Sequence, residues 1–247
     1  PEKWSFERLE EDRRELGSVV FNREKQNQVI DDSTALFPLR WLENCLEPSL
    51  RMGEVPDGTS LRIYQGIDLA LVTDRRQAQQ NDSDYTVILT LGVRADGTRI
   101  VLDIFRRRGM TPDETIHSIV QEACRWNPIR IIVENNLFQK LLELELIRRT
   151  DLPITGHTTT RKKADPYEGV PSLSVLFENR KILLPCGDEE SREKSNLLIQ
   201  ELHGLGVEKH DDLVMALWLA GRALPLTKGK KQYNIARDDL LVSVPNR

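Results

Sequence analysis

The chain has 247 residues, with 35 basic and 39 acidic side chains and a formal net charge of −4. No run of eighteen or more apolar residues occurs, so we expect no membrane span. The 3 cysteines are widely spaced and form no CxxC pair, so we expect reduced thiols and no cysteine-based metal or redox centre. The acidic balance argues mildly against nucleic acid as a partner, although local basic runs matter more than the total.

Residues 1–60 differ in composition from the rest of the chain. They are dense in charge, and their apolar residues are too sparse for a full core. Ser5 is a suitable N-cap for a short helix over 5–16. "FPLRWLENCL" is a candidate for a short segment that packs onto the following domain. "EPSLRMGEVPDGTS" contains Pro and Gly residues that interrupt helices and strands, which is typical of a linker. We expect residues 1–60 to be a partly docked connector from another domain.

From residue 61 onward the apolar spacing becomes regular, which predicts one domain over residues 61–226. "ADG" has the Asp-Gly pair typical of a type I′ hairpin turn. The elements expected, in chain order, are strands over 61–72, 85–94 and 98–107, a helix over 111–126, a strand over 129–135, a helix over 137–149, a strand over 152–160, a helix over 172–180, a strand over 181–185, and helices over 188–202 and 211–224. This order predicts an α/β fold with a mixed central sheet, its first three strands antiparallel, and helices on both faces. We expect the basic tail, 227–247, to be flexible.

Several carboxylates occupy positions where the pattern favours other residues. Asp68 lies within the strand "GIDLA", and Glu134 ends the strand "IIVEN". Asp211 and Asp212 open the apolar helix "DDLVMALWLAG". Because a buried, unpaired carboxylate is costly, these acids need partners. The first and fourth strands become neighbours in the predicted sheet, so we expect the acids to meet at one end of it.

Each acid also has an ordinary structural interpretation. Asp68 would suit a strand end that pairs with a basic side chain, although the adjacent Gly66 suits a close approach by another group. Glu134 would suit the start of a helix, and Asp211 or Asp212 would suit an N-cap. A cluster of them favours a metal site, because Mg²⁺ and Mn²⁺ prefer hard oxygen ligands and relieve the repulsion between gathered carboxylates.

These residues carry a resemblance to a known family. From about Tyr64 to Leu224 the chain resembles the nuclease domain of the large terminase subunit of tailed bacteriophages, which has a ribonuclease H-like (RuvC-like) fold. The matching segments are "YQGIDLA", "DSDYTVILTLGV", "IIVENN" and "KHDDLVMALWLA". "LGSVVFNREKQNQ" resembles the connector after the ATPase domain of that family. No G-x-x-x-x-G-K-[ST] loop is present, so we expect a C-terminal fragment, starting at Pro1, that does not hydrolyse ATP.

The resemblance implies a metal-dependent endonuclease that cuts concatemeric double-stranded viral DNA during packaging. Asp68, Glu134 and Asp212 correspond to the family's catalytic metal ligands, with Asp211 as a further ligand. Asp84 matches an acidic position of part of the family, and is either an auxiliary ligand or a strand-start residue. The implied cofactor is Mg²⁺ or Mn²⁺, with two ions in the DNA complex. The implied partners are the ATPase motor domain, the portal and the small terminase subunit, in the cytoplasm of the infected bacterial host.

Basic runs are the candidates for DNA contact, since neutralised phosphates supply much of the affinity for DNA. We favour Arg161, Lys162 and Lys163, whose loop follows the strand next to that of Glu134. Arg75 and Arg76 are further candidates, and a solvated face is the ordinary interpretation of any such run. His210 precedes the aspartates, where it would act in proton transfer or metal binding, or lie behind the ligands or on the surface.

Two other classes of function remain open at this point. Another ribonuclease H-like enzyme, of the Holliday-junction resolvase or transposase type, would share the acids and differ in its substrate. A non-catalytic docking module for the portal or motor would use the same acids as helix caps and surface ion pairs.

Overall fold

The computed structural model describes residues 35–70, 85–134, 145–148, 150–158, 161–165, 168–207 and 210–224. Several predictions fall outside these residues or outside the described side chains: the helix over 5–16, Asp84, Arg75 and Arg76, most of the helix over 137–149, the tail 227–247, and the side chains of Arg161 and Lys162. Within the described residues, no helix has the length and apolar character needed to cross a membrane.

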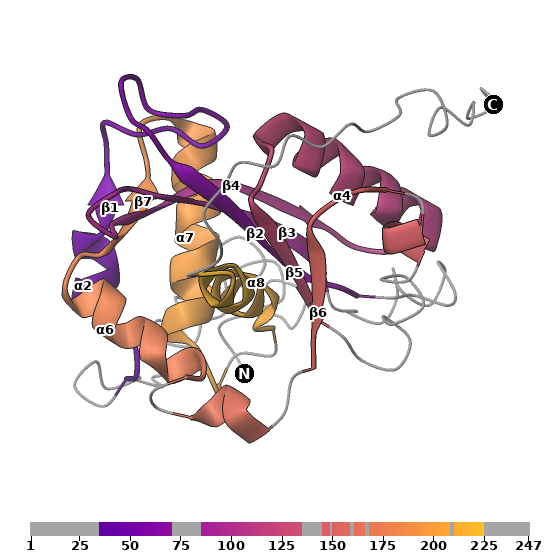
Figure 1. Cartoon of the computed structure of the whole chain (residues 1–247). Helices are drawn as coiled ribbons and strands as arrows, with labels where there is room; N and C mark the ends of the chain where they lie inside the picture. The colour runs from indigo at the N-terminus through magenta and orange to yellow at the C-terminus, as the bar shows by residue number, and fades with distance from the viewer. Residues whose placement is uncertain are drawn as a thin grey trace, which may run out of the picture.

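A mixed seven-stranded sheet forms the centre of the described structure, in the order β1-β7-β4-β3-β2-β5-β6 (Figure 1). The elements in chain order are α2 (Leu39–Asn44), β1 (Leu46–Glu47), β2 (Arg62–Asp68), β3 (Thr86–Val93), β4 (Arg99–Arg107), α4 (Pro112–Trp126), β5 (Arg130–Glu134), β6 (Ile154–His157), the 3₁₀ turns η1 (Arg161–Ala164) and η2 (Val170–Ser172), α6 (Leu173–Glu178), β7 (Ile182–Pro185), α7 (Glu189–His203) and α8 (Asp212–Arg222).

The pairing of the strands confirms the predicted mixed sheet. β2 and β3 are antiparallel, as are β3 and β4. β5 lies parallel to β2, with Ile67 opposite Val133, and β6 lies parallel to β5. β7 lies parallel to β4, and the two-residue strand β1, which the sequence did not predict, extends the sheet beyond β7.

The hairpin between β3 and β4 corrects the predicted turn type. A type I′ turn needs a positive φ at both central residues, and neither Ala95 nor Asp96 has one. Only Gly97 does, with φ 83°, and its N–H donates to the carbonyl of Arg94 at 3.1 Å. Asp96 instead accepts a hydrogen bond from the N–H of Thr98 at 2.9 Å. The loop is therefore one residue longer than the two-residue type I′ loop, and the glycine closes it.

Helices lie on both faces of the sheet (Figure 1), and hydrophobic clusters fill the space between the helices and the strands. On one face, residues such as Ile67, Ile88 and Val133 pack with the apolar side of α4. On the other face, Tyr64 and Ile132 pack in a core that includes α8 and residues of α2, α6 and α7. Helices therefore cover both faces, as predicted.

The described part of the predicted connector contributes to the core on the α8 face. Phe37, Leu42 and Cys45 are fully buried there, and the Phe37 ring meets the Phe177 ring of α6 edge-on at 5.9 Å between centroids. Residues on both sides of the linker therefore share one hydrophobic core.

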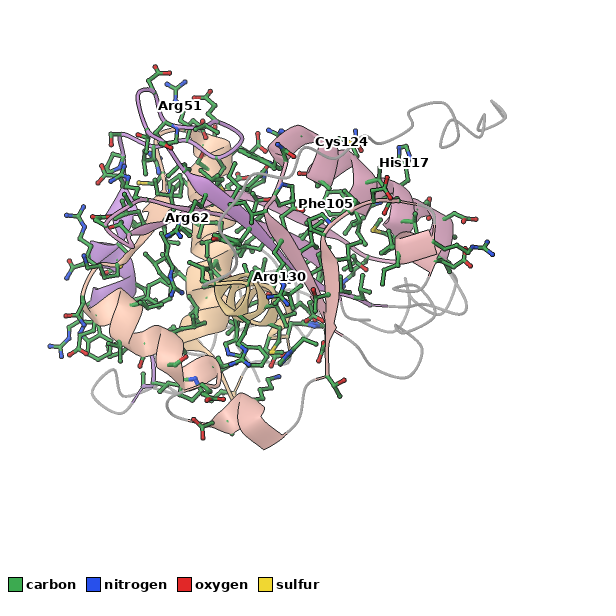
Figure 2. The ribbon with its side chains drawn as sticks, viewed as in Figure 1. Arg51, Arg62, Phe105, His117, Cys124 and Arg130 are labelled. Atoms are coloured by element: carbon green, nitrogen blue, oxygen red, sulfur yellow. The ribbon has the colours of Figure 1, made fainter. Side chains whose placement is uncertain are left out.

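The helix α4 has the ends that its sequence predicts. Thr111 is the N-cap in a capping box with Glu114, and Pro112 occupies the first turn. Figure 2 shows His117 and Cys124 on the outward side of α4, away from the sheet. Cys124 is exposed, whereas Cys45 and Cys186 are buried, and all three are free thiols.

Gly66 of β2 allows α8 to approach the sheet closely. A Cβ at this position would overlap the carbonyl oxygen of Ala216 and the backbone nitrogen of Ala220. Only glycine leaves room for a helix backbone at this distance. The contact holds the middle of α8 against β2, on the strand that ends at Asp68.

Candidate active site

Asp68 and Glu134 are the last residues of two neighbouring parallel strands. The register pairs Gly66 with Ile132 and Ile67 with Val133, so Asp68 and Glu134 follow at matching positions. Side chains alternate along a strand, which places both acids on the face of Gly66 and Ile132, toward α8. The register of β2 and β5 and the alternation of side chains along them therefore bring two carboxyl groups from distant parts of the chain to one end of the sheet.

Asp68 and Glu134 are close enough for a hydrogen bond between their carboxyl groups when Asp68 is protonated. Burial raises the pKa of Asp68 well above its usual value, and the hydrogen bond with Glu134 and the negative charges of Glu134, Asp212 and Asp211 raise it further. Asp68 is only 8% exposed. Without a cation, the end of the sheet therefore holds a carboxyl group that resists ionisation.

The first turn of α8 adds two more acids. Asp212 is buried, and its Oδ2 accepts a hydrogen bond from the backbone N–H of Tyr85 at 3.1 Å. Asp211 is more open, and its Oδ2 lies 2.6 Å from Nζ of Lys163. Both aspartates repel the ionised form of Asp68, so the structure gathers Asp68, Glu134, Asp211 and Asp212 as predicted.

The donor chemistry of this cluster fits a hard divalent cation, although the side chains are not arranged around one. Among the described residues, no group of three or more His, Cys, Asp or Glu side chains is positioned to hold a metal. Asp68 and Glu134 face each other, whereas Asp212 accepts from a backbone N–H and Asp211 faces a lysine. A cation bound here would offset the repulsion among the carboxylates, which adds to the effect of burial in raising the pKa of Asp68.

Aromatic and basic side chains surround Asp212. The guanidinium groups of Arg106 and Arg108 lie 3.5 and 4.0 Å from the centroid of the Tyr85 ring. His210 meets the same ring edge-on at 5.8 Å between centroids. Its Nδ1 is 3.7 Å from Oδ2 of Asp212, and its Nε2 is 3.3 Å from Nη2 of Arg108. The predicted auxiliary histidine is therefore within electrostatic reach of the cluster.

The basic candidates divide into those that the structure places and those outside its described part. Lys163 of η1 reaches the cluster through Asp211. Arg161 and Lys162 share the same short helix, but their side chains are not described. Arg75, Arg76 and Asp84 lie outside the described residues, so the predictions for them stay predictions.

Glu201 is a residue that the sequence analysis did not single out. It lies on α7, is 7% exposed, and accepts hydrogen bonds from Arg106 and from the backbone N–H of Leu213. Its position three residues after Leu198 lies near the buried side of the helix, and this spacing was the available signal. The sequence of α7 is mostly polar and does not show that Glu201 is buried. Its partners come from β4 and α8, which only the folded structure brings close to it.

The fold and the acids at the end of the sheet define a ribonuclease H-like domain. The family model described as the terminase RNaseH-like domain matches residues 66–222, more than half of the chain. The chain belongs to this family. The match spans Asp68, Glu134 and Asp212, and thus all three elements that form the cluster.

Solved structures with the same fold come from phage terminases. The large terminase nuclease from thermophilic phage G20c with bound magnesium is 18% identical, with a TM-score of 0.54 over 76% of this chain and 97% of that one. The large terminase nuclease domain of Thermus phage P74-26 is 15% identical, with a TM-score of 0.51 over 81% of this chain and 100% of that one. Among curated proteins, no match was found.

Proposed function

We propose that this chain is a divalent-metal-dependent endonuclease that hydrolyses phosphodiester bonds of concatemeric double-stranded DNA during the packaging of a phage genome. The gathering of Asp68, Glu134 and Asp212 at one end of the sheet is the observation that carries the proposal. Membership of the terminase family and the likeness to nuclease domains with bound metals support it.

In this proposal Asp68, Glu134 and Asp212 are the catalytic ligands, and Asp211 is a further ligand. Bound Mg²⁺ or Mn²⁺, expected as two ions in the DNA complex, would supply an activated water and neutralise the leaving oxygen. Asp68, whose pKa is raised, has to lose its proton before it binds a cation. Metal binding should therefore release protons and weaken as the pH falls.

Positive groups at the rim of the cluster are the proposed contacts to the DNA backbone. Lys163 already lies beside Asp211, and Arg161 and Lys162 precede it in the same short helix. Contacts to phosphate oxygens position the duplex without reading its sequence, so we expect cleavage with little base specificity. We propose Arg75 and Arg76 as additional contacts.

Two residues are proposed as auxiliaries rather than principal ligands. His210, beside Asp212 and Arg108, is suited to proton transfer at the edge of the cluster. Asp84, which immediately precedes Tyr85 in the sequence, is proposed as an auxiliary metal ligand, with a strand-start role as the alternative.

We further propose that residues 61–226 act within a larger terminase subunit. Residues 1–60 would lead from an ATPase motor domain, and 227–247 would form a basic tail. The portal and the small terminase subunit are the proposed partners, and the cytoplasm of the infected host is the proposed location. These proposals rest on the family.

The test is plasmid cleavage by the purified protein. Mg²⁺ or Mn²⁺ should allow nicking and linearisation of supercoiled DNA, and a chelator should abolish both. Asp68→Ala should be inactive, whereas the matched control Asp57→Ala, at an exposed loop position, should cut like wild type. An Asp68→Ala variant that cuts as well as wild type would contradict the proposal. A strong preference for four-way junctions over linear duplex would instead indicate a resolvase.

A further inference from the structure

The helix α8 receives its N-terminal cap from another helix. The first N–H groups of a helix have no partners within it. Asp211, at the N-cap position, makes no side-chain cap hydrogen bond, and its carboxylate faces Lys163 instead. The N–H of Leu213, the second residue of α8, donates to Oε2 of Glu201 at 2.7 Å. A side chain of α7 therefore does what the N-cap residue usually does.

The same carboxylate is anchored on its other side. Oε1 of Glu201 accepts from Nη2 of Arg106 at 2.9 Å, and the two side chains are 9% and 19% exposed. A buried ion pair holds its geometry strongly, because breaking it leaves a charge without compensation. Arg106 comes from the end of β4, so Glu201 is fixed relative to the sheet. Through these two contacts, Glu201 connects the first turn of α8 to the end of β4.

Contacts made by Arg106, Tyr85 and Glu201 surround Asp212. The Arg106 guanidinium stacks 3.5 Å from the centroid of the Tyr85 ring, and the backbone N–H of Tyr85 donates to Oδ2 of Asp212. Glu201 accepts a hydrogen bond from the backbone N–H of Leu213, the residue after Asp212. The close contact at Gly66 sets the distance between α8 and β2, but it lies one turn further along the helix. Fixing the first turn itself requires the Glu201 cap.

From this geometry we infer that Glu201, anchored by Arg106, is a positioning residue of the active site, which fixes the first turn of α8 so that Asp212 faces Asp68. The inference rests on the proposed function, since it gives Glu201 a role toward the same metal site. Glu201 does not itself touch the metal or the substrate in this account. The ordinary alternative is an ion pair that contributes only to folding stability.

The experiment compares Glu201→Leu, Glu201→Gln and the double variant Glu201→Leu/Arg106→Leu with wild type. Two quantities are measured on each protein without DNA: the melting temperature without metal, and the affinity for Mn²⁺ by titration calorimetry. Plasmid cleavage as a function of Mn²⁺ concentration completes the set. Loss of a group that orients a ligand typically weakens metal binding by about 10–100-fold.

The three variants separate positioning from stability. Glu201→Leu should melt lower and bind Mn²⁺ at least about tenfold more weakly. The double variant should regain melting temperature, because Arg106 no longer leaves a buried charge unpaired, yet its Mn²⁺ affinity should stay low. Glu201→Gln should keep most of the affinity, because its amide oxygen still accepts from the N–H of Leu213. A purely stabilising role would move affinity and melting temperature together.

The control is a second buried carboxylate, whose basic partners lie on α4 and α7 and not on α8. The Asp103 side chain is 8% exposed and lies 2.8 Å from Nη1 of Arg125 and 2.9 Å from Nζ of Lys194. Asp103→Leu should lower the melting temperature while leaving Mn²⁺ affinity unchanged. Wild-type Mn²⁺ affinity in either folded Glu201→Leu or the folded double variant would overturn the inference and leave the proposed function intact. If wild type itself binds no Mn²⁺ and cuts no DNA, the proposed function fails instead.

Discussion

Replacing Gly66 by alanine tests how closely the site depends on the packing of α8 against β2. The added Cβ would lie 3.0 Å from Cα of Ala220 and would overlap the backbone of Ala216. Backbone atoms cannot rotate away, so α8 must retreat by on the order of 1 Å to restore ordinary contact. Overpacking of this kind costs about 1–3 kcal/mol of stability. A displacement of about 1 Å in a catalytic group can cost roughly 100-fold in rate.

The assay combines a thermal melt with Mn²⁺-dependent plasmid cleavage. Gly66→Ala should remain folded, with a lower melting temperature and cleavage reduced by about 100-fold. Gly92→Ala is the matched control, since the atoms nearest its Cβ would belong to side chains: Cδ1 of Leu61 at 2.8 Å, and Cδ1 and Cγ of Leu102 at 2.9 and 3.1 Å. Gly92 pairs with Ile63, far along the strand from Asp68, so this variant should lose stability and keep cleavage.

One result would refute this reasoning. If Gly66→Ala is folded and cuts DNA at the wild-type rate, then the approach of α8 to β2 does not position the acids. Equal losses of cleavage in Gly66→Ala and Gly92→Ala would also contradict it, because a general loss of stability would then explain both.

Three further predictions concern the acids. Asp68→Asn should raise the melting temperature of the metal-free protein, because a neutral amide avoids the cost of burying a charge and the repulsion by the neighbouring acids. The same variant should lower cleavage by more than about 100-fold. A lower melting temperature of the metal-free variant would count against this prediction. Asp212→Asn should weaken Mn²⁺ binding far more than Asp211→Asn, since the Asp212 side chain is 8% exposed and the Asp211 side chain 41%; equal calorimetric affinities would contradict it. Burial raises the pKa of Glu201 from 4.5 to about 7, against the opposing effects of Arg106 and the Leu213 N–H. The folded protein then holds this proton more tightly than the unfolded chain, so stability present below pH 4.5 should be lost as the pH rises through 7, by roughly 3 kcal/mol. Urea unfolding should show a flatter pH profile for Glu201→Gln, and parallel profiles would oppose the assignment.

The sequence predicted the elements of the fold well because their signals are local. The capping box at Thr111 and the β-branched run at β5 each specify an element without help from distant residues. The position of Asp68 was informative because a carboxylate interrupts an apolar strand, and Gly66 beside it correctly indicated close approach. The same argument failed for the turn before β4, where Asp-Gly favoured a type I′ turn and a longer loop was adopted.

The groups that organise the cluster could not be predicted from spacing. Glu201, Arg106 and Tyr85 come from different elements and become neighbours only when the sheet and α7 pack together. The pairing of Asp211 with Lys163 is of the same kind. Contacts of this type depend on tertiary distances, and a helix rich in charged residues gives little sign of which one is buried.

The most direct test of the central claim is a crystal structure of the protein soaked in Mn²⁺, with the metal located by its anomalous scattering. Mn²⁺ should be bound to carboxylate oxygens of Asp68 together with Glu134 or Asp212, with bonds to the metal in place of the contact between Asp68 and Glu134. Anomalous density elsewhere, with Asp68 and Glu134 still facing each other and Asp212 still accepting from the Tyr85 N–H, would contradict it.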